Sequence, residues 1–149
     1  MPPASRQLFE RPCELTGRLL PFKPLYHWLE YWGCWVAAGS GRSQSALAQL
    51  IEREETGWIR STSNDGYPRE IELLEKALAR TRLANRFQFR VLCQLHIGKM
   101  TFLQIGQEHG IRRRGVERTL WYAYSSTEAH LVMLDPAMLL RPAPVYVRT

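Results

Sequence analysis

Residues 101–124 read TFLQIGQEHGIRRRGVERTLWYAY, and this stretch indicates both a fold and a kind of partner. Two short helical patterns are separated by a glycine at position 110, and apolar residues recur in each at the spacing of an amphipathic helix. A short turn that sets two helices at a steep angle is typical of a helix-turn-helix. Gly106 is expected to allow a close approach of the two helices. The predicted inward-facing positions are Phe102, Ile105, Gly106, Ile111, Val116 and Leu120.

Three consecutive arginines open the second predicted helix. A helix that enters a major groove with its N-terminus first brings such side chains to phosphates and guanine edges. The competing interpretation is a surface hairpin with solvated arginines. Thr101 is also a good helix N-cap, which is slightly favoured over DNA contact. Glu117 is expected to pair with Arg113 or Arg114, although it can also accept from a cytosine amino group. The predicted DNA-contacting residues are Arg112, Arg113, Arg114, Glu117, Arg118, Lys99, Thr101 and Gln104.

The composition suits a folded protein with a polyanionic partner. The chain has 149 residues, of which 45% are hydrophobic and 11% aromatic, so one domain with a real core is expected rather than global disorder. The formal net charge is +6, and all basic residues except Lys23, Lys76 and Lys99 are arginines. Arginine favours bidentate contacts with phosphate or guanine, although a GC-rich genome also raises its content.

The basic charge is concentrated in and before the predicted helix-turn-helix. Between residues 80 and 118 the only acidic residues are Glu108 and Glu117. This distribution strengthens the prediction of nucleic-acid binding. The basic residues of this stretch are Arg80, Arg82, Arg86, Arg90, Lys99, Arg112, Arg113, Arg114 and Arg118.

The residue pattern argues against several other classes. Cys13, Cys34 and Cys93 form no Cys-x-x-Cys pair, so neither a metal site nor a redox motif is expected, and Cys93 is predicted to be a buried thiol. No catalytic set, glycine-rich phosphate loop or cofactor motif is present, so we predict no enzyme activity and no cofactor. Neither a signal peptide nor a membrane span is recognisable, which predicts a cytoplasmic protein.

The hydrophobic periodicity predicts an all-α fold. Residues 1–23 are expected to form an irregular, proline-rich arm, residues 24–134 an all-α domain, and residues 135–149 a non-helical tail. Helices are predicted over 24–38, 43–55, from 68 onward, over 85–97, and from the second helix of the pair to 134, with a polar loop at 57–68. Apolar residues expected in the core of these helices are Leu25, Trp28, Leu29, Trp32, Trp35, Val36, Ile71, Leu74, Leu78, Leu83, Phe87, Val91, Leu92 and Leu95.

A second motif adds a family resemblance. Residues 29–38 read LEYWGCWVAA. This segment resembles the Leu-Glu-x-Trp-Gly-x-Trp start of the late antitermination Q proteins of lambdoid phages, of the phage 21 type. The layout of residues 86–124 is similar to the helix and the sigma-region-4-like helix-turn-helix in the second half of that family. Departures are Gly106 in place of the usual alanine, the arginine triplet, and the longer proline-rich ends.

The resemblance implies a specific function. Members of the family bind a double-stranded DNA element near a promoter and load onto a paused, sigma-containing bacterial RNA polymerase. They extend the RNA exit channel as a ring through which nascent RNA passes, so terminators are read through. In a bacterial host such a protein is associated with the nucleoid, and one or two copies on the DNA element are equally compatible with the sequence.

The sequence leaves some roles and functions open. Arg80, Arg82, Arg86 and Arg90 either line an RNA path or form a solvated helix face, and Tyr122 and Tyr124 either pack or contact a groove. The main alternative function is a helix-turn-helix regulator that binds promoters without antitermination activity. A protein-binding adaptor is a third class.

Overall fold

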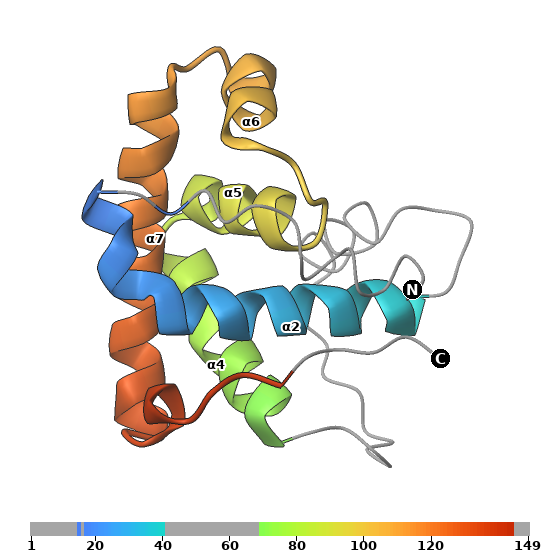
Figure 1. The fold of residues 1–149 in the computed structure, drawn as a ribbon, viewed down its shortest axis with the longest axis vertical. Helices are drawn as coiled ribbons and strands as arrows, with labels where there is room; N and C mark the ends of the chain where they lie inside the picture. Colours follow the sequence, from blue (N-terminus) through green and yellow to red (C-terminus); the bar gives the residue numbers. More distant parts are fainter. Residues whose placement is uncertain (1–14, 16, 41–68, 145–149) are drawn as a thin grey trace.

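The computed structural model describes residues 15, 17–40 and 69–144, and every regular element within these ranges is helical (Figure 1). The predicted all-α class is therefore confirmed for this part of the chain. The predicted helix at 43–55 and the polar loop at 57–68 lie outside the described residues. The elements are η1 (Gly17–Phe22), α2 (Lys23–Ser40), α4 (Arg69–Ala84), α5 (Arg86–His96), α6 (Phe102–His109), α7 (Arg113–Leu134) and η2 (Met138–Leu140).

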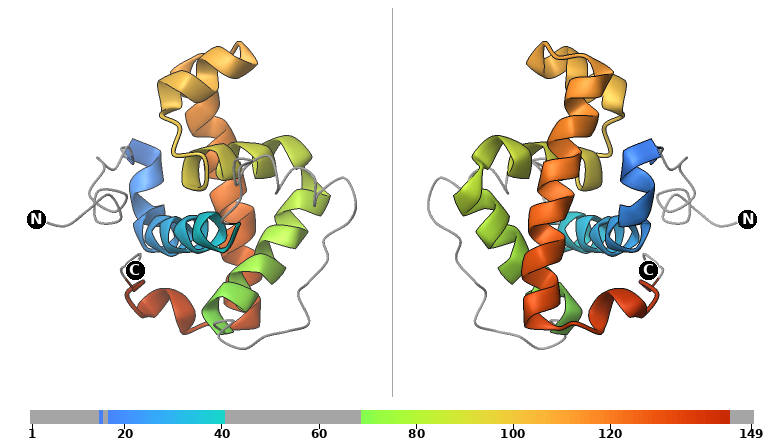
Figure 2. Two further views of the ribbon diagram at one scale, coloured as in Figure 1. Left: turned by 90° about the vertical axis from the view of Figure 1, so that its right-hand side faces the viewer. Right: turned by 90° about the vertical axis from the view of Figure 1, so that its left-hand side faces the viewer.

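The longest helix, α7, is the axis of the fold. It contacts α4, α5, α6, η1 and η2, and α2 crosses in front of it at a steep angle in Figure 1. Its C-terminal half lies among the other helices, whereas its N-terminal end extends with α6 beyond them (Figures 1 and 2). The helix ends at Leu134, and Asp135 and Pro136 follow, as the sequence predicts.

The tryptophans of α2 belong to the core, as expected. Trp28 and Trp32 are buried, and Trp35 is partly buried against the same cluster. Trp32 donates its indole N–H to Oε2 of Glu75 on α4, at 3.3 Å. A buried tryptophan usually finds such a partner, because an unsatisfied N–H in an apolar environment is costly.

Gly33, which follows Trp32, allows a close approach between α2 and the end of α5. A Cβ atom built on Gly33 would lie 2.0 Å from the carbonyl oxygen of His96 and 2.6 Å from its carbonyl carbon. Any side chain at position 33 would thus collide with the backbone at the C-terminal end of α5. The glycine of the Trp-Gly-x-Trp motif therefore sets the spacing between α2 and α5.

The predicted irregular arm is wrong at its C-terminal end. Residues 17–22 form the 3₁₀ helix η1, in which Leu19 and Phe22 are buried. The ring of Phe22 packs against Trp121 and Tyr124 of α7, with centroids 6.3 and 5.6 Å apart. The buried Leu19 and Phe22 are three residues apart, which is one turn of a 3₁₀ helix. The surrounding prolines hid this short apolar pattern in the sequence.

The predicted non-helical tail also needs correction. Residues 138–140 form η2, and Met138 is fully buried. Trp28 donates its indole N–H to the carbonyl of Arg141, at 3.1 Å. Arg141 also donates to Asp135 at 3.1 Å, and this bond, followed by one from the Ala137 backbone, lowers the pKa of that carboxyl. The start of the tail is thus folded back against α2.

Two residues predicted for the core lie at the surface. Leu83 is 75% exposed and Phe87 is 39% exposed, because both flank the junction of α4 and α5 where the chain turns outward. Phe87 instead contacts His109 of α6 edge to face, with centroids 5.0 Å apart. The polar side chains of Gln94 and His96 take buried positions on α5.

The role of Gly33 predicts an unusual response to alanine. Glycine to alanine normally stabilises the interior of a helix by up to about 1 kcal/mol. At Gly33 the collision with the His96 backbone reverses the sign, and Gly33→Ala should lower the free energy of unfolding by about 3 kcal/mol, as expected for severe overpacking. Urea denaturation followed by circular dichroism measures this difference.

Gly115 of α7 is the matched control. A Cβ there would lie 3.4 Å from Cβ of Ile111, which is an ordinary contact. Gly115→Ala should therefore leave the stability unchanged or raise it by up to about 1 kcal/mol. Equal stabilities of the two variants would contradict the close helix approach at Gly33.

Candidate nucleic-acid interface

The α6–α7 corner, meaning α6, the turn at Gly110 and the start of α7, is built by strong local signals. The Thr101 hydroxyl accepts from the Gln104 backbone N–H at 3.1 Å, and the Gln104 side chain accepts from the Thr101 N–H at 2.9 Å. This capping box begins α6. Gly110 ends it with a φ of +68°, a conformation that glycine adopts without strain.

Thr101 and Gln104 are therefore committed first to helix capping. This is the role that the sequence slightly favours for Thr101. For Gln104 it differs from the predicted DNA contact, because its side-chain oxygen is engaged by the backbone. Both residues stay exposed on the surface of the corner.

Gly106 shows why a small residue is needed in this corner. A Cβ atom there would lie 2.6 Å from the carbonyl oxygen of Ile111, and the Ile111 N–H donates to the Gly106 carbonyl at 2.9 Å. The close approach is thus to the turn that leads into α7. Val116 and Leu120 of α7 are fully buried behind it, as predicted.

Gln94 fastens the corner to α5. Its amide donates to the Glu108 carboxylate, and its carbonyl accepts from Nε2 of His109 at 2.8 Å. One buried side chain of α5 therefore holds the C-terminal end of α6 at two points. This attachment orients the start of α7 relative to the core.

The arginine cluster, meaning Arg112, Arg113, Arg114 and Arg118, lies exposed at the start of α7. Arg112 is the N-cap residue of the helix and makes no side-chain cap bond. Positions 114 and 118 lie opposite the buried Val116 and Leu120 around the helix. The structure therefore brings together the arginines that the sequence singles out.

Arg113 differs from the other three arginines because the protein itself engages it. Its Nε lies 3.1 Å from Oε1 of Glu117, and its guanidinium stands 4.8 Å from the ring centroid of Phe102. The side chain is still 53% exposed. The favoured interpretation of Glu117 as an arginine partner agrees with this contact.

Lys99 does not belong to the cluster. Its Nζ lies 3.3 Å from Oε1 of the buried Glu30 of α2, and its side chain is only 18% exposed. Lys99 is therefore engaged by an internal ion pair, and its DNA contact stays a prediction. The backbone of Lys99 has a φ of +55°, so the chain turns sharply there and aims the side chain toward α2.

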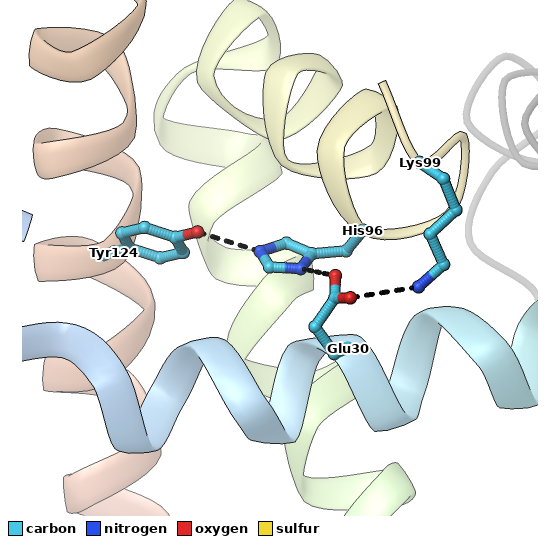
Figure 3. A network of polar contacts seen from close by, with 4 residues as sticks. All are labelled: Glu30, His96, Lys99 and Tyr124. Atoms are coloured by element: carbon cyan, nitrogen blue, oxygen red, sulfur yellow. Dashed lines mark hydrogen bonds and ion pairs between the residues drawn. The ribbon is translucent and has the colours of Figure 1, made fainter. Parts of the chain in front are cut away.

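A buried polar network that sequence reasoning missed lies next to this ion pair (Figure 3). Nδ1 of His96 lies 2.8 Å from Oε2 of Glu30, and Nε2 lies 2.9 Å from the Tyr124 hydroxyl. An ionised carboxylate only accepts, so Nδ1 carries a proton, and the Tyr124 hydroxyl donates to Nε2 when the ring is neutral. The signal was present in the sequence, since Glu30 and His96 interrupt apolar helix faces.

The network is shielded from solvent. The side chain of His96 is 0% exposed and that of Glu30 is 4% exposed. The three side chains come from α2, α5 and α7, which they join through hydrogen bonds. Its role in this structure is to hold those helices together.

The second basic group lies around the junction of α4 and α5. Arg80 and Arg86 are exposed, whereas Arg82 and Arg90 are partly buried. Arg86 and Arg90 are spaced i, i+4, so they lie on one side of α5. The two interpretations of this group, an RNA path or a solvated face, both remain compatible with that exposure.

Other features bear on the remaining predictions. Cys93 is buried, as expected, and so is Cys34. In the described part of the chain, no three histidine, cysteine or acidic side chains gather as a metal site would need. Among the same residues, no helix combines the length and the apolar character that crossing a membrane requires.

Comparisons with known proteins give no independent assignment. No protein-family model matches the chain, and neither the curated proteins nor the solved structures include a match.

The buried network predicts different responses at two neighbouring tyrosines. Tyr124→Phe removes the hydroxyl that faces Nε2 of His96, so it should lower the free energy of unfolding by about 1–3 kcal/mol. Tyr122 is 52% exposed, and Tyr122→Phe should change stability by less than about 0.5 kcal/mol. Thermal and urea unfolding of both variants measure these values. An unchanged Tyr124→Phe variant would argue against the network as a structural tie.

Proposed function

We propose that this protein is a transcription antitermination factor that binds DNA through a helix-turn-helix formed by α6 and α7. The observation that carries the proposal is the exposed arginine cluster at the start of a helix that extends beyond the core (Figure 2). Gly106 and Gly110 support it, since they allow the tight turn between the two helices. Helix α6 and the start of α7 fall within residues 101–124, the stretch from which the motif is proposed.

In this proposal α7 is the recognition helix. The major groove of B-DNA is about 12 Å wide and admits one α-helix. Arg112 and Arg114, nearest the N-terminus, approach base edges, and Arg118 neutralises a phosphate. Arg113 contributes charge while its contacts with Glu117 and Phe102 brace the corner. The preceding helix α6 crosses the DNA backbone, where Thr101 and Gln104 present their remaining polar atoms.

The antitermination activity rests on the resemblance of residues 29–38 to the phage 21 type of Q proteins. The physical logic of that activity is steric, because a hairpin is too wide for a ring that admits one RNA strand. The partners in this proposal are a promoter-proximal duplex, RNA polymerase with its sigma subunit, and nascent RNA. A promoter-binding regulator without this activity is the second candidate, favoured by the α6–α7 corner considered alone.

The DNA-binding part is tested with single arginine variants. Arg112→Ala and Arg118→Ala should each weaken binding to promoter-proximal duplexes of the protein's own genome by roughly tenfold. Loss of a phosphate contact at Arg118 should also reduce the slope of log K against log salt by about 1. Fluorescence anisotropy at several salt concentrations measures both quantities.

Arg69→Ala is the matched control, because Arg69 is an exposed arginine at the opposite end of the fold, at the start of α4 (Figure 1). Its removal lowers the net charge equally but should leave duplex affinity nearly unchanged. Equal losses in all three variants would reduce the interaction to bulk charge and overturn the assigned recognition helix.

The activity itself is tested in a reconstituted transcription reaction with the host polymerase and sigma factor. The protein should raise read-through of an intrinsic terminator placed downstream of its cognate promoter, and Arg112→Ala should reduce that effect. A change in initiation with unaltered read-through would instead assign the protein to promoter regulators.

A further inference from the structure

A basic and aromatic groove lies between η1 and α7, next to the proposed recognition surface. Figure 1 shows η1 running beside α7, and the two elements are in contact. A hollow of about 630 Å³, partly open to solvent, lies between them. Its main lining side chains are Arg18, Arg114, Glu117, Arg118, Trp121 and Tyr122.

The groove has an excess of positive charge. Among the described residues, three guanidinium groups and one carboxylate line it, and Oε1 of that carboxylate already lies 3.1 Å from Nε of Arg113. Within the described ranges, Arg18, Arg114 and Arg118 form no ion pair with an acidic side chain. Arg114 and Arg118 are spaced i, i+4, which places like charges side by side at a cost that an anion would relieve.

The aromatic side of the groove is exposed and held in place. Trp121 is 39% exposed and Tyr122 is 52% exposed. Their rings stand perpendicular, with centroids 5.2 Å apart, and the buried Phe22 of η1 meets Trp121 at 81°. Arg114, Arg118 and Trp121 follow at i, i+4, i+7, so one helix face presents the cations and the indole together.

Arginines beside an exposed aromatic ring favour single-stranded over double-stranded nucleic acid. A duplex presents phosphates to an arginine surface but keeps its bases stacked inside. A single strand presents phosphates and base faces together, and stacking on an aromatic side chain is available to every base. The hollow is also in the range of about 300–1,000 Å³ that is typical of small-ligand sites.

We infer that the groove between η1 and α7 binds a short segment of single-stranded nucleic acid. Arg18, Arg114 and Arg118 contact its phosphates, and a base stacks on Trp121. RNA and DNA share this chemistry, and the 2′-hydroxyl alone separates them. The inference does not depend on the proposed recognition of duplex DNA.

The two sites overlap at Arg114 and Arg118, so a duplex and a single strand exclude each other. Arg112 lies outside the groove and serves only the duplex site. Arg18 and Trp121 serve only the groove. Variants at these three positions therefore separate the two activities.

The probes for the test are a fluorescein-labelled uridine octaribonucleotide and a thymidine octadeoxyribonucleotide, read by fluorescence anisotropy with the full chain. Trp121→Ala should weaken binding of the better probe by about tenfold to a hundredfold, which is the usual effect of losing one stacking residue. Trp121→Phe should retain most of the affinity. Arg18→Ala should weaken binding by roughly tenfold and lower its salt dependence.

Arg69→Ala controls for charge, and Arg112→Ala should leave octamer binding unchanged while it weakens the duplex. Circular dichroism shows whether Trp121→Ala folds. Arg18 is exposed, so Arg18→Ala should fold and tests the groove even if Trp121→Ala does not. Tighter binding of the ribo-octamer assigns the groove to RNA, and the reverse assigns it to DNA. Unchanged affinity in both Arg18→Ala and Trp121→Ala overturns the inference, and so does an equal loss of affinity in Arg69→Ala.

The outcomes also separate this inference from the proposed function. Octamer binding with the predicted variant effects, but without specific duplex binding, retains the groove and removes the recognition helix. Duplex binding that depends on Arg112, with no octamer binding, does the opposite.

Discussion

The contact between α2 and the end of α5 is the constraint on which the rest of the structure depends. Gly33 lies against the His96 backbone, and Glu30, one turn earlier, reaches the imidazole of the same residue. His96 in turn meets the Tyr124 hydroxyl of α7. A small residue and a buried polar chain thereby join three helices at one point. A half-satisfied network of this kind would be worse than an apolar core, so its members specify one arrangement of the helices.

In that arrangement the two ends of the continuous helix α7 have different environments. Its C-terminal half supplies core residues such as Tyr124 and Leu131, whereas its N-terminal end carries the arginine cluster outward. Gln94 of α5 holds α6 next to the start of α7, and Phe22 of η1 packs on Trp121 of α7. In the proposed functions, the duplex site and the single-strand groove are neighbouring faces of this rigid element. Their positions are consequently set by the core rather than by loops.

The candidate site was predictable where its signals are local. The capping box at Thr101, the glycines at 106 and 110, and the arginine cluster follow each other within a few residues, and short-range rules describe them well. The sequence could not reveal the ion pair of Lys99, because its partner, Glu30, is far away in the sequence. Arg18 was missed for the same reason, since only the packing of η1 on α7 brings it to the arginines at 114 and 118.

The sequence by itself determined the all-α class, most helix boundaries, the burial of Trp28 and Trp32, and the outward arginines of α7, because helical periodicity and capping depend on neighbours within about one turn. The tertiary structure alone decided which polar groups became internal partners and which surfaces face each other. Glu30 and His96 only interrupt apolar patterns in the sequence, and Tyr124 is left open between packing and groove contact, until three helices converge on them. The folding of η1 and η2 onto the core likewise depended on hydrophobic surfaces that distant helices provide.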